Sequence, residues 1–565
     1  MRGAVSRLAA AVIHSFGFAL LPDCMIVYIL CMNFIGRRQL MLAAAGSAFA
    51  PGTLFGDAPR TRIGLVPSNY SKLQRPSSTA DPLDYERVRD MVWTAIRLAG
   101  ARAGSLETKI RPGSWVVIKP NVVGLRGRES YRTGDITDFR VTRAVFEYVA
   151  QFSKAARITF AEGGSYRRLS DPARDNIIFQ DGVRRDAMTF DWGTEEFPGQ
   201  GGSFGAMLAD FRKRYPGRRF DYVDLSYDAV RDASGQFQRI AVPKASNGVG
   251  AFGARPDYYV TNAIRNCDFL ITVPVMKCHL QSGITCCLKN YVGTAPREAY
   301  AVAGTFHNAR LHSGHSVDNR IDPFIVDLAA FHPPDYAVVD GLRGLQYQEH
   351  NCDREDQMVQ SNLVLAGEDP VAVDSLVAYL LGYNPWDMEF LHMAAKRLMG
   401  TRDLAQVDVN GGDAAALRQR WAKPKSWYGR GNRLWRVTDR PDTPLQSWKR
   451  RESSTDTLEF DSSSGKPGAR FAAATRIRSA GHAKAFLWIG ASGRFEALLN
   501  GRPVMQEECR TRYRHGQYQQ AVELQPGMNE LVVRVQALDA GAKLSAYMVG
   551  SRNDGDTVDG IEWLG

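Results

Sequence analysis

The stretch FLITVPVMKCHLQSGITCCLKNYVG, residues 269–293, joins an apolar run to a dense set of polar side chains. Its first five residues, 269–273, have the length and β-branched content of a buried strand, and fully apolar strands are typical of parallel sheets covered on both faces. Ligands of open α/β sheets bind beyond the carboxyl ends of the strands. The stretch therefore predicts a site formed by the polar residues that follow, which are Lys277, His279, Thr285, Lys289 and Asn290.

Similar apolar runs alternate with helical patterns on both sides of this stretch. This alternation predicts the fold class α/β, with a doubly wound, mostly parallel sheet. Residues 85–98 carry apolar side chains at helical spacing. We expect this domain to span residues 59–416, with an insertion of poorly defined structure at 171–253. The predicted strands are 115–118, 158–161, 269–273, 336–339 and 363–366.

Each predicted strand leads into polar residues, which we expect to meet at one edge of the sheet because parallel strands end together. Candidate catalytic residues are Lys277, His279, Lys289 and Asp340. Candidate substrate-binding residues are Lys119, Asn121, Glu162, Thr285, Asn290 and Asp369. The alternative is a buried network of ion pairs that closes the edge of the sheet.

The chemistry of these side chains favours an anionic ligand. Lysine ammonium groups suit a carboxylate, phosphate or sulfate, and a lysine crowded by other lysines can lose its proton and act as a base. His279 would titrate near neutrality and could move a proton or bind a metal. Asp340, Asp369 and Glu162 could orient that imidazole, ligate a hard cation or pair with the lysines.

Three of the ten histidines, His307, His312 and His315, lie within nine residues and could bind a transition metal together with Asp318. The same segment is polar enough to be a lid loop, and the two interpretations are compatible. The eight cysteines form no CxxC pair, so no iron–sulfur or zinc motif is present. The identity of any cofactor is left open; the histidines suggest a divalent or transition metal.

Residues 62–400 resemble the bacterial and archaeal family called domain of unknown function 362 (DUF362). The matching text is VVIKPNVV, FAEGG, LITVPVMKCHLQSGITCCLKNYVG, VVDG and GEDPVAVDSLVAYLLGYNP, with the Thr137-Asp138 pair before a helix. The resemblance implies a fold more than a function. Some members carry ferredoxin-like cysteine motifs, which this chain lacks. The layout is also similar to the nucleotide-like fold of nickel-pincer lactate racemases, which is an analogy of fold.

The first 58 residues resemble a twin-arginine export signal. Arg37 and Arg38 precede a mildly apolar run that ends in Ala48-Phe49-Ala50, with Met32 as the expected start. This predicts contact with the twin-arginine export machinery and a periplasmic or extracellular location, with no stable membrane span in the mature form. The alternative is a membrane anchor over residues 9–35, although His14 and Asp23 interrupt that run.

The net charge of +11 is concentrated in a tryptophan-rich connector, residues 417–456. Residues 417–451 hold eleven Lys or Arg against two Asp, a net +9. Interleaved basic and aromatic residues can bind nucleic acid, but an exported protein rarely meets it, so we expect no nucleic acid partner. Docking across the domain surface is favoured over binding an anionic polymer.

From residue 457 onward, short alternating strands separated by Asn500-Gly501 and Pro526-Gly527 turns predict a C-terminal antiparallel β-sandwich, 457–565. FEALLNGRPV and VELQPGMNELVVRVQ look like the galactose-binding-like domains attached to carbohydrate enzymes.

Three functions remain open. The first is an enzyme acting on an anionic small molecule or acidic saccharide, the second a non-enzymatic metal- or anion-binding protein, and the third a metal-dependent redox protein.

Overall fold

The computed structural model describes residues 60–100, 104–123, 134–163, 179–180, 183–184, 196–197, 202–300, 309–317, 319–350, 354–424, 427, 429–453, 455–461, 467–508, 513–514, 516–538, 541–550 and 558–565. The predicted export signal, residues 1–58, lies outside these residues. Within them, no helix is long and apolar enough to cross a membrane.

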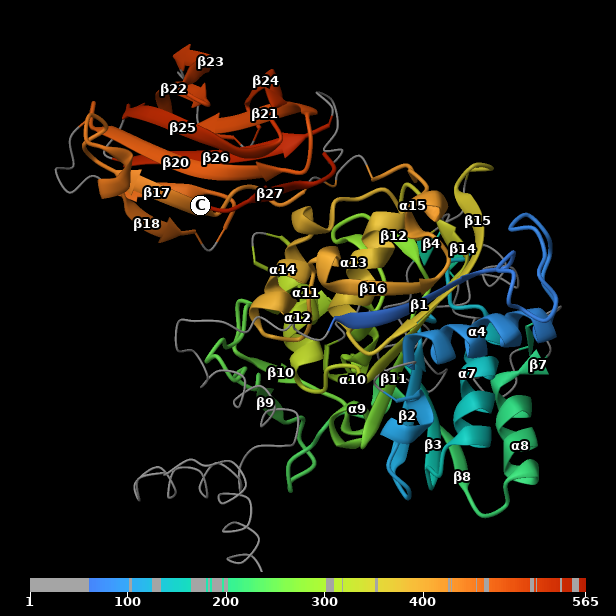
Figure 1. Cartoon of the computed structure of the whole chain (residues 1–565). Helices are drawn as coiled ribbons and strands as arrows, with labels where there is room; N and C mark the ends of the chain where they lie inside the picture. Colours follow the sequence, from blue (N-terminus) through green and yellow to red (C-terminus); the bar gives the residue numbers. More distant parts are fainter. Residues whose placement is uncertain are drawn as a thin grey trace, which may run out of the picture. The chain divides into compact units, whose positions relative to one another are not determined.

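An eight-stranded sheet in the order β16-β1-β15-β14-β11-β2-β3-β8 forms the centre of the α/β part (Figure 1). Seven strands run in one direction, and only β15 is antiparallel to its neighbours β1 and β14. The predicted mostly parallel α/β sheet is confirmed. The strands are β1 (Thr61–Pro67), β2 (Trp115–Pro120), β3 (Arg157–Glu162), β8 (Arg219–Asp224), β11 (Phe269–Val273), β14 (Tyr336–Leu345), β15 (Met358–Gly367) and β16 (Val407–Gly411).

Helices cover both faces of the sheet, as the fully apolar strands require. One face packs against α4 (Tyr85–Gly100), α7 (Phe139–Phe152) and α8 (Phe204–Arg214). The other face packs against α9 (Asn262–Asn266), α12 (Asp322–Ala330), α13 (Pro370–Leu380) and α14 (Glu389–Lys396). The remaining short helices of the described residues are α5 (Leu106–Lys109), α10 (Arg297–Tyr300), α11 (Ala309–His315) and α15 (Ala414–Leu417).

The strand order reverses between β2 and β11. From β2 the chain proceeds outward through β3 to β8, then returns to the other side of β2 as β11 and proceeds to β14. Neighbouring connections that leave in opposite directions open a crevice at the carboxyl ends of the two strands. Lys119, near the end of β2, and the polar segment after β11 both lie beside this crevice.

Part of the predicted insertion, residues 171–253, belongs to the main sheet. α8 and β8 extend the sheet beyond β3, with β3 and β8 paired in parallel. The apolar residues of α8 repeat at helical spacing and pack under the sheet beside those of α7. β9 (Arg239–Ala241) and β10 (Asp257–Tyr259) form a separate antiparallel pair. Further two-residue strand pairs are β4 (Phe179–Gln180) with β5 (Val183–Arg184), and β6 (Glu196–Phe197) with β7 (Gly202–Ser203).

The C-terminal part contains two antiparallel sheets that share one hydrophobic core, so the predicted sandwich is confirmed. One sheet has the order β18-β17-β20-β25-β22-β23, with β27 paired to β20, and the other has the order β19-β26-β21-β24. Their strands are β17 (Leu434–Thr438), β18 (Lys449–Glu452), β19 (Leu458–Asp461), β20 (Arg470–Ser479), β21 (Ala483–Ala491), β22 (Gly493–Leu499), β23 (Arg502–Glu508), β24 (Tyr518–Leu524), β25 (Gly527–Ala537), β26 (Gly541–Val549) and β27 (Ile561–Trp563).

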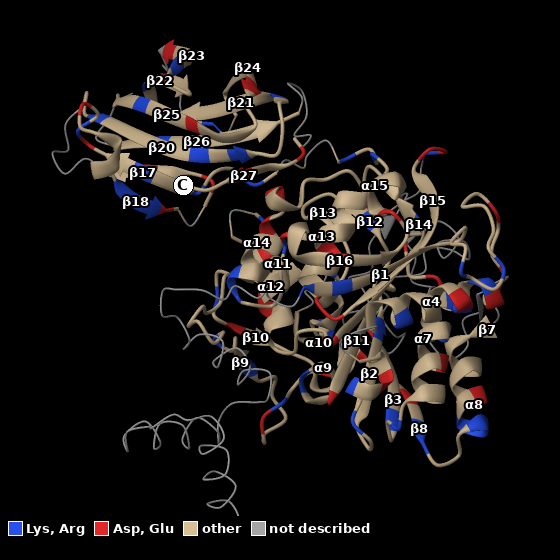
Figure 2. Cartoon of the chain, viewed as in Figure 1, with Lys and Arg blue, Asp and Glu red and all other residues tan. Residues whose placement is uncertain are grey.

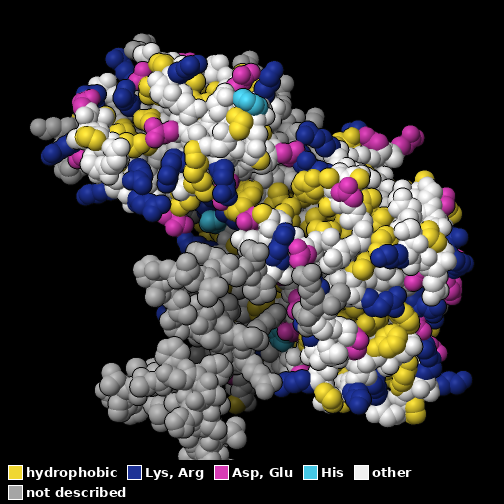
Figure 3. Space-filling model, in the orientation of Figure 1, with side chains coloured by type: hydrophobic (Ala, Val, Ile, Leu, Met, Phe, Trp, Pro, Cys, Tyr) yellow, Lys and Arg dark blue, Asp and Glu magenta, His cyan; other side chains and the backbone are white. Residues whose placement is uncertain are grey.

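The predicted connector is divided between the two parts of the fold. Its strands β17 and β18 belong to the sandwich, and Figure 2 shows the basic residues of β18 in blue. Trp421 and Trp427 pack into the α/β core, and Trp435 packs into the sandwich core. Trp448 packs against Ala472 and Ala474 of β20, in a cluster separate from that core. All four indole rings are buried and are therefore not free to stack on bases. Lys and Arg side chains are numerous over the sandwich face seen in Figure 3.

Asp369 lies away from the carboxyl ends of the parallel strands, so its predicted place at the common edge is wrong. It follows β15, the one antiparallel strand, which ends at the opposite edge of the sheet. Its carboxylate caps α13, where Oδ1 accepts from the backbone N–H groups of Val371 and Ala372. Oδ2 accepts from the backbone N–H of Thr401.

We expect Asp369→Ala to lower the stability of the α/β part by about 1 kcal/mol, because the α13 N-terminus loses its cap. Asp369→Asn, which keeps an oxygen at the cap, should recover most of the loss. Urea denaturation followed by circular dichroism measures both variants. Equal stability of the Ala variant and the wild type would contradict the capping role.

Candidate functional site

The segment after β11 doubles back on itself and presents its polar side chains to the crevice. β12 (Lys277–His279) and β13 (Gly283–Thr285) form an antiparallel hairpin in which Lys277 lies opposite Thr285. The backbone N–H of Met276 donates to the Asp340 carbonyl, which holds this hairpin against β14. The 3₁₀ helix η3 (Lys289–Thr294) then carries Lys289 and Asn290 back toward the end of β2.

A cavity of about 180 Å³ lies at this edge of the sheet. Seven of the ten residues predicted as catalytic or substrate-binding line it, and Asn290 lies directly behind it. The predicted lining residues are Lys119, Asn121, Glu162, Lys277, His279, Thr285 and Lys289. Residues that sequence reasoning missed include Gln281, Gly293, Arg297, Glu349 and His350.

The Lys119 ammonium is held by four acceptors. Its Nζ donates to both carboxylate oxygens of Glu162 at 2.9 and 3.0 Å, to Asn290 Oδ1 at 2.8 Å and to the Pro120 carbonyl at 3.1 Å. Burial lowers the pKa of Lys119 despite the opposing charge of Glu162. A Cβ at Gly293 would come within 3.0 Å of both partners, so only glycine lets η3 pass this close. Lys119 is thus a fixed charge.

Lys277 is also fully bonded. Its Nζ donates to Asp135 Oδ1 at 2.8 Å, to the Asp135 carbonyl, and to the Glu349 carbonyl at 2.7 Å. His350 Nδ1 lies 2.7 Å from the same Asp135 carboxylate oxygen. Lys277 and His350 together hold the pKa of Asp135 well below its usual range, in spite of its burial. This triad therefore fixes the loop that carries Glu349.

The imidazole of His279 is neutral and oriented. Its Nδ1 accepts from the backbone N–H groups of Gln281 and Ser282, which leaves the proton on Nε2, 3.4 Å from Glu349 Oε1. Burial lowers the pKa of His279 well below 6.5, so the expectation that it titrates near neutrality is wrong. Burial raises the pKa of Glu349, but His279, His350 and the backbone N–H of Leu280 bring it down to about 2. His279 can offer a hydrogen bond, but it is a poor acid.

Lys289 differs from the other two lysines because its amine makes no hydrogen bond or ion pair with any residue in the described part of the chain. Burial, and then the positive charges of Lys277 and Lys119, lower its pKa to about 8 against the opposing effect of Glu349. Two more groups at the cavity lack partners among the described residues, the Thr285 hydroxyl and the Asn121 carbonyl oxygen. The free amine and these two oxygens are available to a ligand.

Asp340 is buried behind the cavity and does not line it, so its predicted catalytic position is wrong. Its Oδ2 accepts from the backbone N–H of Asp138 at 2.6 Å and its Oδ1 from that of Leu342 at 2.9 Å. Burial and the charge of Asp138 raise the pKa of Asp340 to about 7. The carboxyl joins the start of α7 to β14 and so shapes the floor of the site.

The predicted histidine metal cluster is divided in the structure. His312 lines the cavity, and burial followed by the charge of Lys289 lowers its pKa to about 4. His315 instead stacks on Tyr258 with ring centroids 3.9 Å apart. Neither belongs to a group of three close metal-ligating side chains among the described residues. His307 and Asp318 lie outside those residues.

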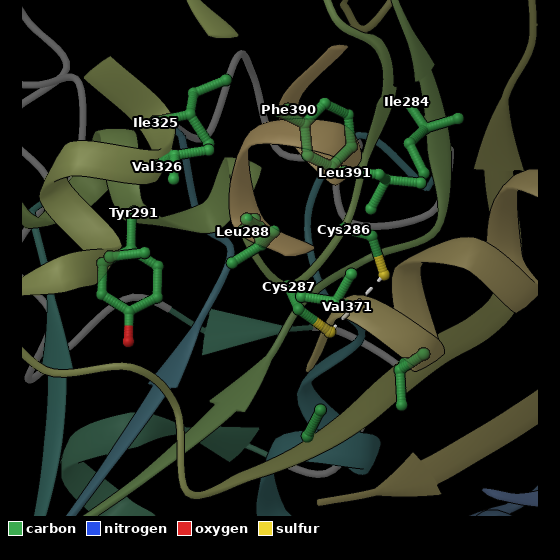
Figure 4. Close-up of a cluster of buried hydrophobic side chains, with 14 of the residues drawn as sticks. Ile284, Cys286, Cys287, Leu288, Tyr291, Ile325, Val326, Val371, Phe390 and Leu391 are labelled. Atoms are coloured by element: carbon green, nitrogen blue, oxygen red, sulfur yellow. Dashed lines mark hydrogen bonds between the residues drawn. The ribbon is translucent and has the colours of Figure 1, made fainter. Parts of the chain in front are cut away.

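The described residues contain one such group, Cys286, Cys287 and Asp374. Figure 4 shows the two cysteines among apolar side chains that include Leu288 and Val371. The Asp374 carboxylate accepts from the backbone N–H groups of Cys287 and Leu288 at 2.7 and 3.0 Å. Burial raises the pKa of the Cys286 thiol to about 12 and that of Asp374 to about 6. Protonated thiols are poor metal ligands. Cys286 and Cys287 therefore contribute to the packing of the core.

The sequence did not indicate that Glu349 and His350 belong to the site. Both are polar residues that follow a predicted strand, but β14 continues to Leu345, and their position also depends on the length of the loop after it. Arg297 follows the end of η3, and its position depends on the tight turn of that helix.

Comparison with solved structures finds low similarity. The lactate racemase apoprotein from Thermoanaerobacterium thermosaccharolyticum is 10% identical with a TM-score of 0.26, and the alignment covers 52% of this chain and 55% of that chain. A β-glucosidase from Kluyveromyces marxianus is 7% identical with a TM-score of 0.17, covering 21% of this chain and 16% of that chain. This chain therefore spans less than two thirds of either, and similarities this low carry no argument about function.

No curated protein matches the chain. Residues 233–379 match the family model described as "Domain of unknown function (DUF362)". The match includes β11, β12, β13, η3 and β14, the elements that build most of the cavity. It therefore supports the assignment to the DUF362 family that the sequence motifs predicted.

Proposed function

We propose that this chain is an enzyme that acts on a small anionic molecule, with Lys289 as the group that reacts with the substrate. The observation that carries the proposal is the contrast among three lysines at one cavity. Lys119 and Lys277 are saturated by hydrogen bonds, whereas the amine of Lys289 has no partner among the described residues.

The charges at the cavity favour an anion. Four cationic side chains line it, Lys119, Lys277, Lys289 and Arg297, against the carboxylates of Glu162 and Glu349. Asp135, behind Lys277, adds one more negative charge and leaves an excess of one positive charge. A carboxylate or similar group would balance that excess, and the volume of about 180 Å³ suits a molecule of a few carbon atoms.

Lys289 can supply chemistry that a fixed charge cannot. A pKa of about 8 leaves a useful fraction of the amine neutral near neutral pH, so it can take a proton from a substrate or attack a carbonyl carbon. The Thr285 hydroxyl can donate a hydrogen bond to a substrate oxygen, and the Asn121 carbonyl oxygen can accept one from a substrate hydroxyl or amino group. His279, with its proton on Nε2, is a further donor at the same wall.

We also propose that the chain is exported by its twin-arginine signal to the periplasm, and that the sandwich is a galactose-binding-like accessory domain. The Arg37-Arg38 pair and the mildly apolar run that follows support the export proposal. The alternating strand pattern and the shared core of the two sheets support the domain proposal.

Replacing the free lysine should stabilise the protein, and replacing a paired one should not. The folded pKa of Lys289 lies below that of an unfolded lysine, near 10.4, so the folded state binds fewer protons between about pH 8 and 10.4 and stability rises with pH across this window. Lys289→Met removes that cost and should stabilise at pH 7. The shift sets an upper bound of roughly 3 kcal/mol, which solvent screening of this partly exposed side chain reduces.

The matched variant is Lys119→Met, which leaves Glu162 buried without its ammonium partner and should destabilise by roughly 3–5 kcal/mol. Urea denaturation at pH 7 and pH 10 measures both variants. The gain from Lys289→Met should shrink at pH 10. A Lys289→Met variant that is less stable than the wild type at pH 7 would contradict the unpaired amine.

Competitive labelling with acetic anhydride tests the function itself. We expect Lys289 to react with a midpoint near pH 8, with exposed Lys484 as the reference amine, when labelled peptides are quantified by mass spectrometry. Acetate, pyruvate or sulfate should protect Lys289, because each can occupy the anion site. Pyruvate with cyanoborohydride then separates the two chemistries: reductive attachment at Lys289 marks a nucleophile, and its absence marks a base. A midpoint above pH 10, or no protection by any of the three anions, would reject the proposal.

A further inference from the structure

A second cavity, of about 380 Å³, lies between the α12 and α14 region and residues 430–457. It shares no lining residue with the first cavity. Its size is within the range of small-molecule sites. Its lining includes three apolar residues, Phe252, Pro323 and Met393, and a larger set of charged or polar ones, Arg320, Arg430, Arg433, His392, Lys396, Glu389, Glu452 and Asp456.

Three arginines and two carboxylates form a buried network at this cavity. Glu389 accepts from Arg430 Nε at 2.8 Å and from Arg433 Nη1 at 2.9 Å. Asp456 accepts from Arg433 Nε and from Arg320 Nη1, each at 2.8 Å. The network therefore has an excess of one positive charge.

Asp322 lies 3.7 Å from Arg320, and burial raises its pKa to about 6, so its carboxylate balances the charge of the network near neutral pH. The nearby charge of Arg402 is opposed by Glu562, Glu389 and Asp387. Lys396 is balanced by Glu452 at 2.7 Å. The case for a bound anion therefore depends on the hydrogen-bond donors that the network leaves unused.

Arg430 is the residue that faces this cavity with free donors. The residue is only 5% exposed, and it uses Nε for Glu389. Its two terminal nitrogens make no hydrogen bond with any residue that the structure describes. A guanidinium with both terminal groups free is suited to a planar, two-oxygen acceptor.

The charged side chains that act on His392 are all positive. Burial, and then the charges of Arg430, Arg402, Arg433 and Lys396, hold the pKa of His392 far below its usual value. The imidazole is therefore neutral and does not add to the charge. It can donate or accept one hydrogen bond beside the guanidinium.

We propose that this cavity binds a carboxylate-bearing organic ligand, with the carboxylate on the terminal nitrogens of Arg430 and the ligand body against Phe252, Pro323 and Met393. This site is independent of the proposed function of the first cavity. Arg430 supplies a cation with two unused terminal nitrogens, and the apolar lining residues favour an organic acid over an inorganic anion.

Isothermal titration calorimetry of the full chain with benzoate and with D-glucuronate tests the proposal, with benzyl alcohol and D-glucose as neutral analogues. We expect the wild type to bind at least one acid in preference to its analogue. Arg430→Gln should weaken that binding at least tenfold. Arg476→Gln, which removes an exposed arginine of β20, should leave it unchanged.

Two further variants keep the result interpretable. Lys289→Met removes the amine of the first cavity and should preserve this binding. If Arg430→Gln does not fold, Thr455→Trp serves instead, because it fills the cavity from a half-buried lining position and retains every arginine. The inference is overturned if neither acid binds the wild type, if the folded Arg430 or Thr455 variant binds as the wild type does, or if Lys289→Met abolishes the binding.

Discussion

The Lys119–Glu162 ion pair is the interaction on which the first cavity depends. It joins the ends of β2 and β3, and through Asn290 it also holds η3 against the sheet. Burying two opposite charges gains little stability by itself, because desolvation offsets their attraction. The ion pair instead fixes a position: by binding Asn290 it holds η3 beside the end of β2, which places Lys289 at the crevice where the strand order reverses.

Two of the three lysines, Lys119 and Lys277, are ion-paired, and they set the pKa of the third. Their hydrogen bonds hold the site together, while their positive charges lower the pKa of Lys289. The edge therefore combines buried ion pairs at Lys119 and Lys277 with the unpaired amine of Lys289 on which the proposed site depends. A reactive amine requires the structural pairs beside it.

The sequence predicted the residues whose positions follow from strand direction. Lys119, Glu162 and the segment from Lys277 to Asn290 follow parallel strands, and parallel strands end at one edge. The prediction for Asp369 was wrong because an apolar sequence does not show whether its strand is parallel or antiparallel. The antiparallel pairing of β15 places Asp369 at the opposite edge of the sheet. Glu349, Arg297 and the Arg430 network depend on loops and on contacts far apart in sequence, for which no local pattern exists.

The two cavities differ in the chemistry that their side chains allow. A group that moves a proton in each cycle needs a pKa near the working pH, and Lys289 meets this condition. A guanidinium keeps its proton, and burial followed by the nearby positive charges keeps His392 neutral, so neither Arg430 nor His392 exchanges a proton near neutral pH. This difference in side-chain chemistry is why we propose a reaction at the crevice between β2 and β11 and ligand binding at the arginine network.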